Sequence, residues 1–106
     1  MSDQEFADGL AKLPDEVADA LLVWRKATIV RESDESKLFI EYKNKAIHES
    51  AAFGTSKSDN YTTALVRSDK RWVEVKMVEA AAEAIHFRLY ERLMSVKKTA
   101  GIRAGF

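Results

Sequence analysis

The stretch TIVRESDESKLFIEY, residues 28–42, decides the fold of this chain, because two apolar runs flank seven residues that lack a hydrophobic side chain. The seven residues are Arg31–Lys37. Three structures fit this pattern: a β-hairpin with a polar tip, a break between two helices, or one long helix with a polar waist. The sequence on either side of this stretch distinguishes between these three alternatives.

Glycine and proline punctuate the chain at its ends and at its middle, at Gly9, Pro14, Gly54, Gly101 and Gly105. Neither residue type interrupts 15–53 or 55–100. The segment GTSKSDN, residues 54–60, is the only cluster of turn formers. This punctuation predicts two long elements joined by one loop.

The β-hairpin alternative places strands at 28–31 and 38–43, with a second pair at 62–67 and 71–76. Their β-branched residues favour it locally. However, the connecting turns lack the Asn-Gly or Asp-Gly chemistry that tight hairpins prefer. The pattern of 27–43 therefore leaves strand and helix open, and its surroundings favour the helix.

The helical alternative has Pro14 in a first turn, followed by Asp15 and Glu16 at the positive end of the helix dipole. Apolar residues then recur at spacings of three and four on both sides of the waist. We therefore favour a long helix that is kinked or loosened at the waist, where Ser33 is a candidate N-cap.

The second half of the chain has apolar residues on two opposite faces of a predicted helix. The first face comprises Val75, Val78, Ala82, Ile85, Leu89, Leu93 and Val96. The second face comprises Val73, Met77, Ala80, Ala84, Phe87 and Met94. One antiparallel helix covers only one face, so we expect the second face to be the interface of a homo-oligomer. The alternative is a three-helix monomer in which Phe6–Leu13 folds back over the second face.

The expected architecture is thus a single all-α domain, a long antiparallel helical hairpin that forms a dimeric four-helix bundle or a higher helical oligomer. Its expected parts are a helix at about 14–52 with the waist at 31–37, a loop at about 54–60, a helix at about 61–98 and a flexible tail at 99–106.

The formal net charge is zero, but the charges are unevenly distributed. Residues 1–20 hold six acidic residues and one lysine, a net charge of −5, whereas 88–106 hold five basic residues and one glutamate, a net charge of +4. This polarity favours self-association or solubility. The basic end is also a candidate for nucleic-acid phosphate contacts, through Arg88, Arg92, Lys97, Lys98 and Arg103.

We expect no enzyme, no catalytic residue, no cofactor and no metal site. His48 and His86 lack the spacing of metal ligands, and no phosphate-binding glycine loop or nucleophile motif occurs. The acidic residues at 32–35 are better explained as a solvated helix face than as catalytic carboxylates. Trp24 and Trp72 lie on apolar stripes, which favours core positions over stacking on bases.

A resemblance to a family rests on Asp69, the AAAEA run at 80–84, Arg92-Leu93 and Lys97, within residues 66–101. These features resemble small helical-hairpin, coiled-coil-like proteins of tailed phages, which are often encoded near recombination and replication genes. The resemblance implies an accessory role in DNA metabolism. Our leading hypothesis is an accessory role in DNA recombination or replication, in which basic ends displayed in several copies hold single-stranded DNA or a recombinase. Two other functions stay open: an adaptor or inhibitor that docks an apolar helix face on a host enzyme, and a structural virion component.

The expected location is cytoplasmic, in the host cytoplasm if the chain is phage-encoded. The chain has no cysteine and its acidic N-terminus does not resemble a signal peptide. Its apolar runs are far shorter than the roughly 20 residues of a membrane span, so we expect no membrane partner.

Overall fold

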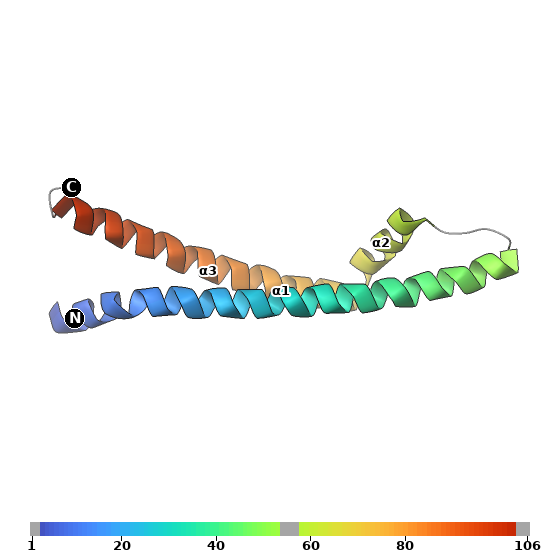
Figure 1. Ribbon diagram of the computed structural model, residues 1–106, viewed down its shortest axis with the longest axis horizontal. Helices are drawn as coiled ribbons and strands as arrows, with labels where there is room; N and C mark the ends of the chain where they lie inside the picture. The colour runs from blue at the N-terminus through green and yellow to red at the C-terminus, as the bar shows by residue number, and fades with distance from the viewer. Residues whose placement is uncertain (1–2, 54–57, 104–106) are drawn as a thin grey trace. The chain divides into compact units, whose positions relative to one another are not determined.

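The computed structural model contains three helices within the residues it describes, 3–53 and 58–103 (Figure 1). Helix α1 is Asp3–Phe53, α2 is Asp59–Ser68 and α3 is Lys70–Arg103. Side chains are described at 3–45 and 58–99. No strand occurs in these ranges, which confirms the predicted all-α class.

The polar waist at 31–37 is part of an uninterrupted α1. The β-hairpins considered for 28–43 and 62–76 are therefore wrong, and the break with Ser33 as N-cap does not occur. Polar side chains four residues apart support each other on a helix surface. In the waist, Arg31 Nη1 donates a hydrogen bond to Glu35 Oε2 at 2.7 Å.

Helix α1 begins at Asp3, so Pro14 lies inside the helix and not in its first turn as predicted. A proline inside a helix removes one backbone hydrogen bond and costs about 3 kcal/mol. Burial next to the proline offsets this cost, because Leu13 is only 2% exposed and Val17 is also buried. Residues 6–13 continue α1, so the back-folded third helix of the monomeric alternative is wrong.

Asp69 divides the helix that was predicted as one element over 61–98. Its backbone is extended, with φ −73° and ψ 133°. The Asp69 N–H donates to the Val66 carbonyl at 3.0 Å and ends α2. The Asp69 Oδ1 atom accepts from the Arg71 backbone N–H at 2.8 Å, which is an N-cap bond for α3.

The remaining boundaries differ by a few residues from the predicted ones. Helix α2 begins inside the predicted loop because Ser58 caps it, with Oγ accepting from the Tyr61 N–H at 3.1 Å. Helix α3 continues through Arg103, so the predicted tail at 99–106 is helical at its start. Residues 54–57 of the predicted loop and 104–106 of the predicted tail lie outside the described residues.

The chain divides into two compact units. Unit 1 combines the chain through Lys26 with the chain from Ala80 onward, and unit 2 is Ala27–Glu79. In unit 1 the segments of α1 and α3 run antiparallel, so that the start of α1 and the end of α3 lie at the same end of the unit (Figure 1). Its buried side chains are Leu13, Val17 and Ala20 of α1 and Ala82 and His86 of α3.

Unit 2 combines the rest of α1 with α2 and the start of α3. Its buried residues are Leu38, Thr62, Val66 and Glu79. Lys43 Nζ lies 2.7 Å from Asp59 Oδ1 and joins α1 to α2. Trp72 is half-buried here, as Trp24 is in unit 1, so each is partly covered but neither is among the buried core residues.

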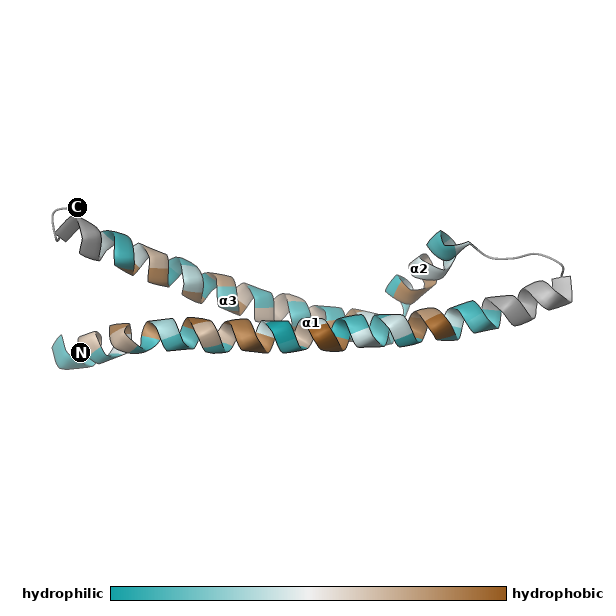
Figure 2. Ribbon diagram, viewed as in Figure 1, coloured by the Kyte–Doolittle hydropathy of each residue, from teal (hydrophilic) through white to brown (hydrophobic). Residues whose placement is uncertain are grey.

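The buried face of α3 is rotated relative to the prediction. Val78 and Ile85 are 63% and 47% exposed, whereas Glu79 and His86 are 3% and 9% exposed. One residue step is about 100° on a helical wheel, and the face has turned by less than one such step, because most of its predicted members stay covered. The other members of the predicted face are buried or half-buried: Val75, Ala82, Leu89, Leu93 and Val96. Figure 2 shows hydrophobic and hydrophilic residues alternating along α3.

Candidate interaction surface

In unit 1, helix α3 exposes an apolar strip made of Ala80, Ala84, Phe87, Tyr90 and Met94, here named the α3 strip. Spacings of three and four residues place these side chains on one face of the helix. Phe87, Tyr90 and Met94 are 45%, 46% and 39% exposed. The strip thus has the composition of a helix-packing face that the described part of this chain leaves partly uncovered.

An aromatic cluster beneath the α3 strip holds two of its large side chains, Phe87 and Tyr90, in place. The ring of Trp24 in α1 lies 5.4 Å from that of His86 and 5.7 Å from that of Phe87. The His86 ring stacks on Tyr90 at 6.1 Å. Aromatic pairs at these separations are favourable, so Phe87 and Tyr90 project from a packed base. His86 Nδ1 is buried without a hydrogen-bond partner among the described residues.

All six residues of the predicted oligomer interface are exposed. Four of them belong to the α3 strip. Val73 and Met77 lie in unit 2, where they are 38% and 67% exposed. The sequence pattern missed Tyr90, although its position three residues after Phe87 and four before Met94 was a sufficient signal. Whether these residues form an interface stays a prediction.

The predicted phosphate contacts Arg88, Arg92, Lys97 and Lys98 are exposed on α3, and the side chain of Arg103 lies outside the described residues. They share unit 1 with the acidic start of α1. The chain through Lys26 holds six acidic and three basic residues, a net charge of −3, and the chain from Ala80 holds two acidic and five basic residues, a net charge of +3. The two charged ends of the sequence therefore belong to one unit of one chain.

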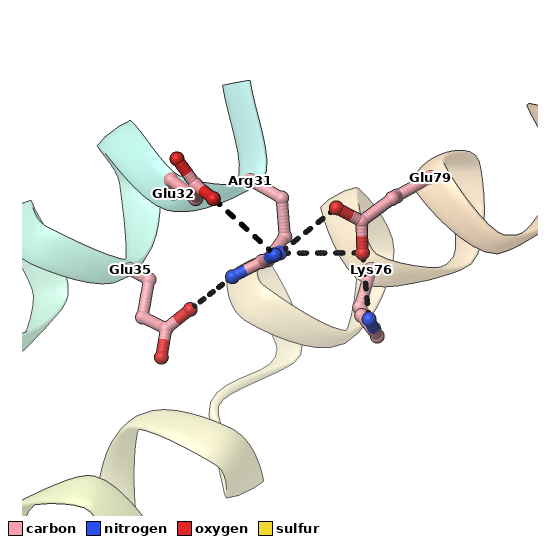
Figure 3. A network of polar contacts seen from close by, with 5 residues as sticks. All are labelled: Arg31, Glu32, Glu35, Lys76 and Glu79. Carbon is pink, nitrogen blue, oxygen red and sulfur yellow. Dashed lines mark hydrogen bonds and ion pairs between the residues drawn. The ribbon is translucent and has the colours of Figure 1, made fainter. Parts of the chain in front are cut away.

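A charged cluster in unit 2 surrounds the buried carboxylate of Glu79 (Figure 3). Arg31 Nε donates to both Glu79 oxygens, at 3.3 and 3.1 Å, and Lys76 Nζ donates to Glu79 Oε1 at 2.6 Å. Arg31 also pairs with Glu35 at 2.7 Å and lies 3.8 Å from Glu32. The cluster connects α1 to α3 within unit 2.

The Glu79 cluster keeps its groups charged. Burial raises the pKa of Glu79, but three side-chain hydrogen bonds outweigh burial and leave this pKa below its ordinary value; the donors are Lys76, Thr28 and Arg31. The hydrogen bond to Glu35 raises the pKa of Arg31 against the opposing effect of burial, and Glu79 adds to the rise. A general acid or base needs a pKa near the working pH, and this cluster moves both groups away from that range.

A second charged cluster lies at the junction of α2 and α3 in unit 2. Arg71 Nη2 donates to Asp69 Oδ2 at 2.9 Å and the Tyr42 hydroxyl donates to the same oxygen at 2.7 Å. Arg71 also makes two hydrogen bonds of 3.1 Å to Glu41. These bonds to Arg71 and Tyr42 hold the pKa of Asp69 well below its usual range, and Asp69 raises the pKa of Tyr42. The junction is thus fixed by ionised groups that are already paired.

An open hollow of about 520 Å³ in unit 2 is lined by one face of α1, at Glu32, Glu35, Ser36, Phe39 and Ile40. Small-molecule sites combine an apolar enclosure with convergent polar groups, and this hollow is open. Among the described residues, no three His, Cys, Asp or Glu side chains converge as metal ligands. Within the same residues, no helix has an apolar stretch long enough to cross a membrane.

Comparison with known proteins adds no relative: no protein-family model matches the chain, and neither a curated protein nor a solved structure matches it. The resemblance to phage helical-hairpin proteins therefore stays a prediction. The α3 strip is an exposed apolar face that could contact another helix, because its large side chains Phe87, Tyr90 and Met94 are partly exposed.

Proposed function

We propose that this chain is a non-catalytic helical protein whose α3 strip binds an apolar face of another helix, most simply in a homo-oligomer. The exposure of Phe87, Tyr90 and Met94 carries this proposal. Each large apolar side chain contributes roughly 1.5–3 kcal/mol when it is fully buried. Completing the burial of three such residues in each chain therefore favours association.

The charged clusters support a binding role over a catalytic one. The carboxylates of Glu79 and Asp69 accept hydrogen bonds from cationic side chains, and their pKa values lie below the ordinary range. Such groups stay ionised near neutral pH and have no proton to donate. They hold helices together inside unit 2, so these two carboxylates are already engaged within the chain.

The antiparallel helices of unit 1 suit assembly into a four-helix bundle. Two helices that share one thin interior present apolar side chains at its margin, and a second pair of helices covers that margin. A two-fold dimer is the simplest closed arrangement, because it uses the same patch on both chains. The proposed object is thus a dimeric or larger helical assembly.

The solution mass of the wild-type chain and a Phe87→Asp variant tests the proposal. We expect the wild type to sediment with at least twice the mass of one chain and the Phe87→Asp variant to be monomeric at the same concentration, because a buried unpaired carboxylate opposes association. The matched control is Leu22→Asp. Leu22 is 53% exposed in unit 1 and lies two residues from Trp24, on the opposite side of α1.

This control distinguishes disruption of the α3 strip from a general effect of adding a negative charge to the surface. The Leu22→Asp variant keeps the wild-type mass if the α3 strip is the interface. A wild-type chain that stays monomeric at all concentrations contradicts self-assembly. The strip would then serve a foreign helix, as in an adaptor or inhibitor of a host enzyme or a virion component.

The second candidate function is an accessory role in phage DNA recombination or replication, as the family resemblance implies. The exposure of Arg88, Arg92, Lys97 and Lys98 supports it, because an oligomer multiplies weak phosphate contacts through effective concentration. Titration of a labelled single-stranded oligonucleotide is expected to show binding that weakens with salt. Absence of binding, or binding that ignores salt, contradicts this role.

A double variant sharpens the DNA experiment. Arg88→Ala with Arg92→Ala removes two proposed phosphate contacts, so the slope of log affinity against log salt falls by roughly 0.7 for each. Lys12→Ala removes an exposed cation from the acidic segment of unit 1 and serves as the control. An equal effect of both variants indicates a general change in net charge instead of a site on α3.

A further inference from the structure

Side chains along one edge of the α3 strip are spaced symmetrically about Tyr90. Glu83 lies seven residues before Tyr90, and Lys97 lies seven residues after it. Residues seven apart share one edge of a helix face, and seven residues span roughly 10 Å of helix. The edge therefore presents an acid, an aromatic ring and a base at equal separations.

The two charges at this edge have no ion-pair partner in the described part of the chain. Among the described residues, no ion pair includes Glu83 or Lys97. Lys97 is exposed, and Glu83 is half-buried beside the strip. Both are available to a partner that approaches the α3 strip.

We propose that the α3 strip binds the α3 strip of a second copy of this chain, antiparallel, with a two-fold axis beside Tyr90. This inference rests on the proposed function and adds the partner and the register. Two-fold antiparallel pairing brings an edge of the strip against the same edge of the second copy in reverse order. Glu83 then faces Lys97 of the second copy at both ends, and the two Tyr90 rings meet at the axis.

The apolar residues fit the same register. Phe87 lies three residues before Tyr90 and Met94 lies four residues after it, so Phe87 packs beside Met94 of the second copy. Contacts between a methionine sulfur and an aromatic ring are favourable. Ala80 and Ala84 are small, which lets the helix axes approach closely.

A parallel two-fold arrangement of the same strips does not bring these charges together. It sets this edge of one strip against the opposite edge of the other, so Glu83 of one copy does not meet Lys97 of the second. A foreign helix or a nucleic acid requires no symmetry of charge about Tyr90. The symmetric spacing therefore favours a second copy over either of these partners.

Exchange of the two charges tests the register. In Glu83→Lys alone or Lys97→Glu alone, like charges face each other at both ends, and we expect each variant to dimerise roughly tenfold more weakly than the wild type. In an equimolar mixture, opposite charges meet again at both ends, so heterodimers form with wild-type affinity. Sedimentation of the three samples at equal concentration, with one variant carrying a mass tag, measures this recovery.

A cysteine at the axis gives a second measurement that does not depend on charge. The chain contains no cysteine, so Tyr90→Cys introduces a single thiol. The proposed axis brings its two copies within the separation that a disulfide spans. We expect mild oxidation to convert most of the Tyr90→Cys chain into a covalent dimer, while the control Leu22→Cys stays largely monomeric.

The outcomes separate this inference from the proposed function. Recovery in the mixture together with cross-linking through Tyr90→Cys supports the register. A wild-type dimer that Phe87→Asp disrupts but charge exchange leaves unchanged, without cross-linking at Tyr90→Cys, overturns the register and leaves the proposed function standing. A wild-type chain that is monomeric throughout, or that binds only single-stranded DNA, overturns the second copy as the partner.

Discussion

At the scale of single residues, Glu79 is a buried carboxylate that holds two helices of unit 2 together. Replacing it by glutamine keeps its shape but removes the negative charge that pairs with Lys76, and leaves Arg31 with only Glu32 and Glu35 as counter-charges. Loss of a charged hydrogen-bond partner costs about 1–3 kcal/mol. We expect Glu79→Gln to lower the free energy of unfolding by this amount, measured by urea unfolding followed by circular dichroism.

The matched control for this change is Glu74→Gln on the same helix. The Glu74 side chain is 63% exposed and lies 3.8 Å from Lys70. Exposed pairs of this kind contribute little, so we expect a change within about 0.5 kcal/mol. Equal losses of unfolding free energy in the two variants would show that burial of Glu79 does not increase its contribution to stability.

The same carboxylate predicts a pH dependence of stability. The folded-state pKa of Glu79 lies below its ordinary value of 4.5. Its contribution is therefore complete above the ordinary value and disappears as the pH falls through the lower folded-state pKa. The difference in unfolding free energy between wild type and Glu79→Gln should be constant from about pH 7 to about pH 5 and should shrink below that. A difference that has the same size at every pH contradicts the lowered pKa.

Glu79 also marks the limit of what the sequence predicts about packing. A helical wheel assigns Glu79 to a charged flank and Val78 to the core, because it weighs each residue by polarity alone. The structure buries Glu79 because Arg31, 48 residues earlier in the chain, supplies a donor. Helical periodicity depends only on residues close together in one helix, so it cannot show that Arg31 is a partner of Glu79.

At the scale of elements, the sequence predicted helical class, the long first helix and most apolar positions correctly. The predicted helix boundaries were wrong, because a single side chain can determine where a helix begins or ends. Asp69 appears in the sequence as an acidic residue within a helical pattern, but its carboxylate caps α3 and accepts from Tyr42. The N-cap could have been predicted from the sequence, since Asp is a preferred N-cap residue. The hydrogen bond from Tyr42 could not, because it depends on the tertiary fold.

The continuity of α1 through the waist predicts the response to a proline at position 34. If Ser33 were an N-cap, proline at the next position would be tolerated in the first turn. Inside an unbroken helix it removes a hydrogen bond and clashes with the preceding turn, at a cost of about 3 kcal/mol. We expect Asp34→Pro to lower both the unfolding free energy and the ellipticity at 222 nm.

Asp34→Ala is the control for the proline variant. Alanine removes the same carboxylate but favours the helix, so we expect stability equal to or slightly above that of the wild type. A proline variant that matches the alanine variant would place a break at the waist and contradict an unbroken α1.

At the scale of the whole molecule, each unit is electrically neutral by itself. Unit 2 holds nine basic and nine acidic residues, and unit 1 sets a segment of net charge −3 beside one of net charge +3. The attraction in unit 1 is between exposed groups. Salt therefore weakens it, since the Debye length falls from about 10 Å at 0.1 M to about 3 Å at 1 M. We expect the wild-type chain to unfold at lower urea in 1 M sodium chloride than in 0.1 M.

A neutralised α1 separates this attraction from general effects of salt. The triple variant Asp15→Asn, Glu16→Gln, Asp19→Asn brings the net charge of the first segment of unit 1 from −3 to zero. Salt then has no long-range attraction to screen, and what remains is the strengthening of apolar burial that many salts produce. The urea midpoint of the triple variant should therefore stay constant or rise with salt while that of the wild type falls. Parallel salt responses of the two chains would mean that local packing, with Leu13 and Val17 at its centre, pairs α1 with α3 without help from charge.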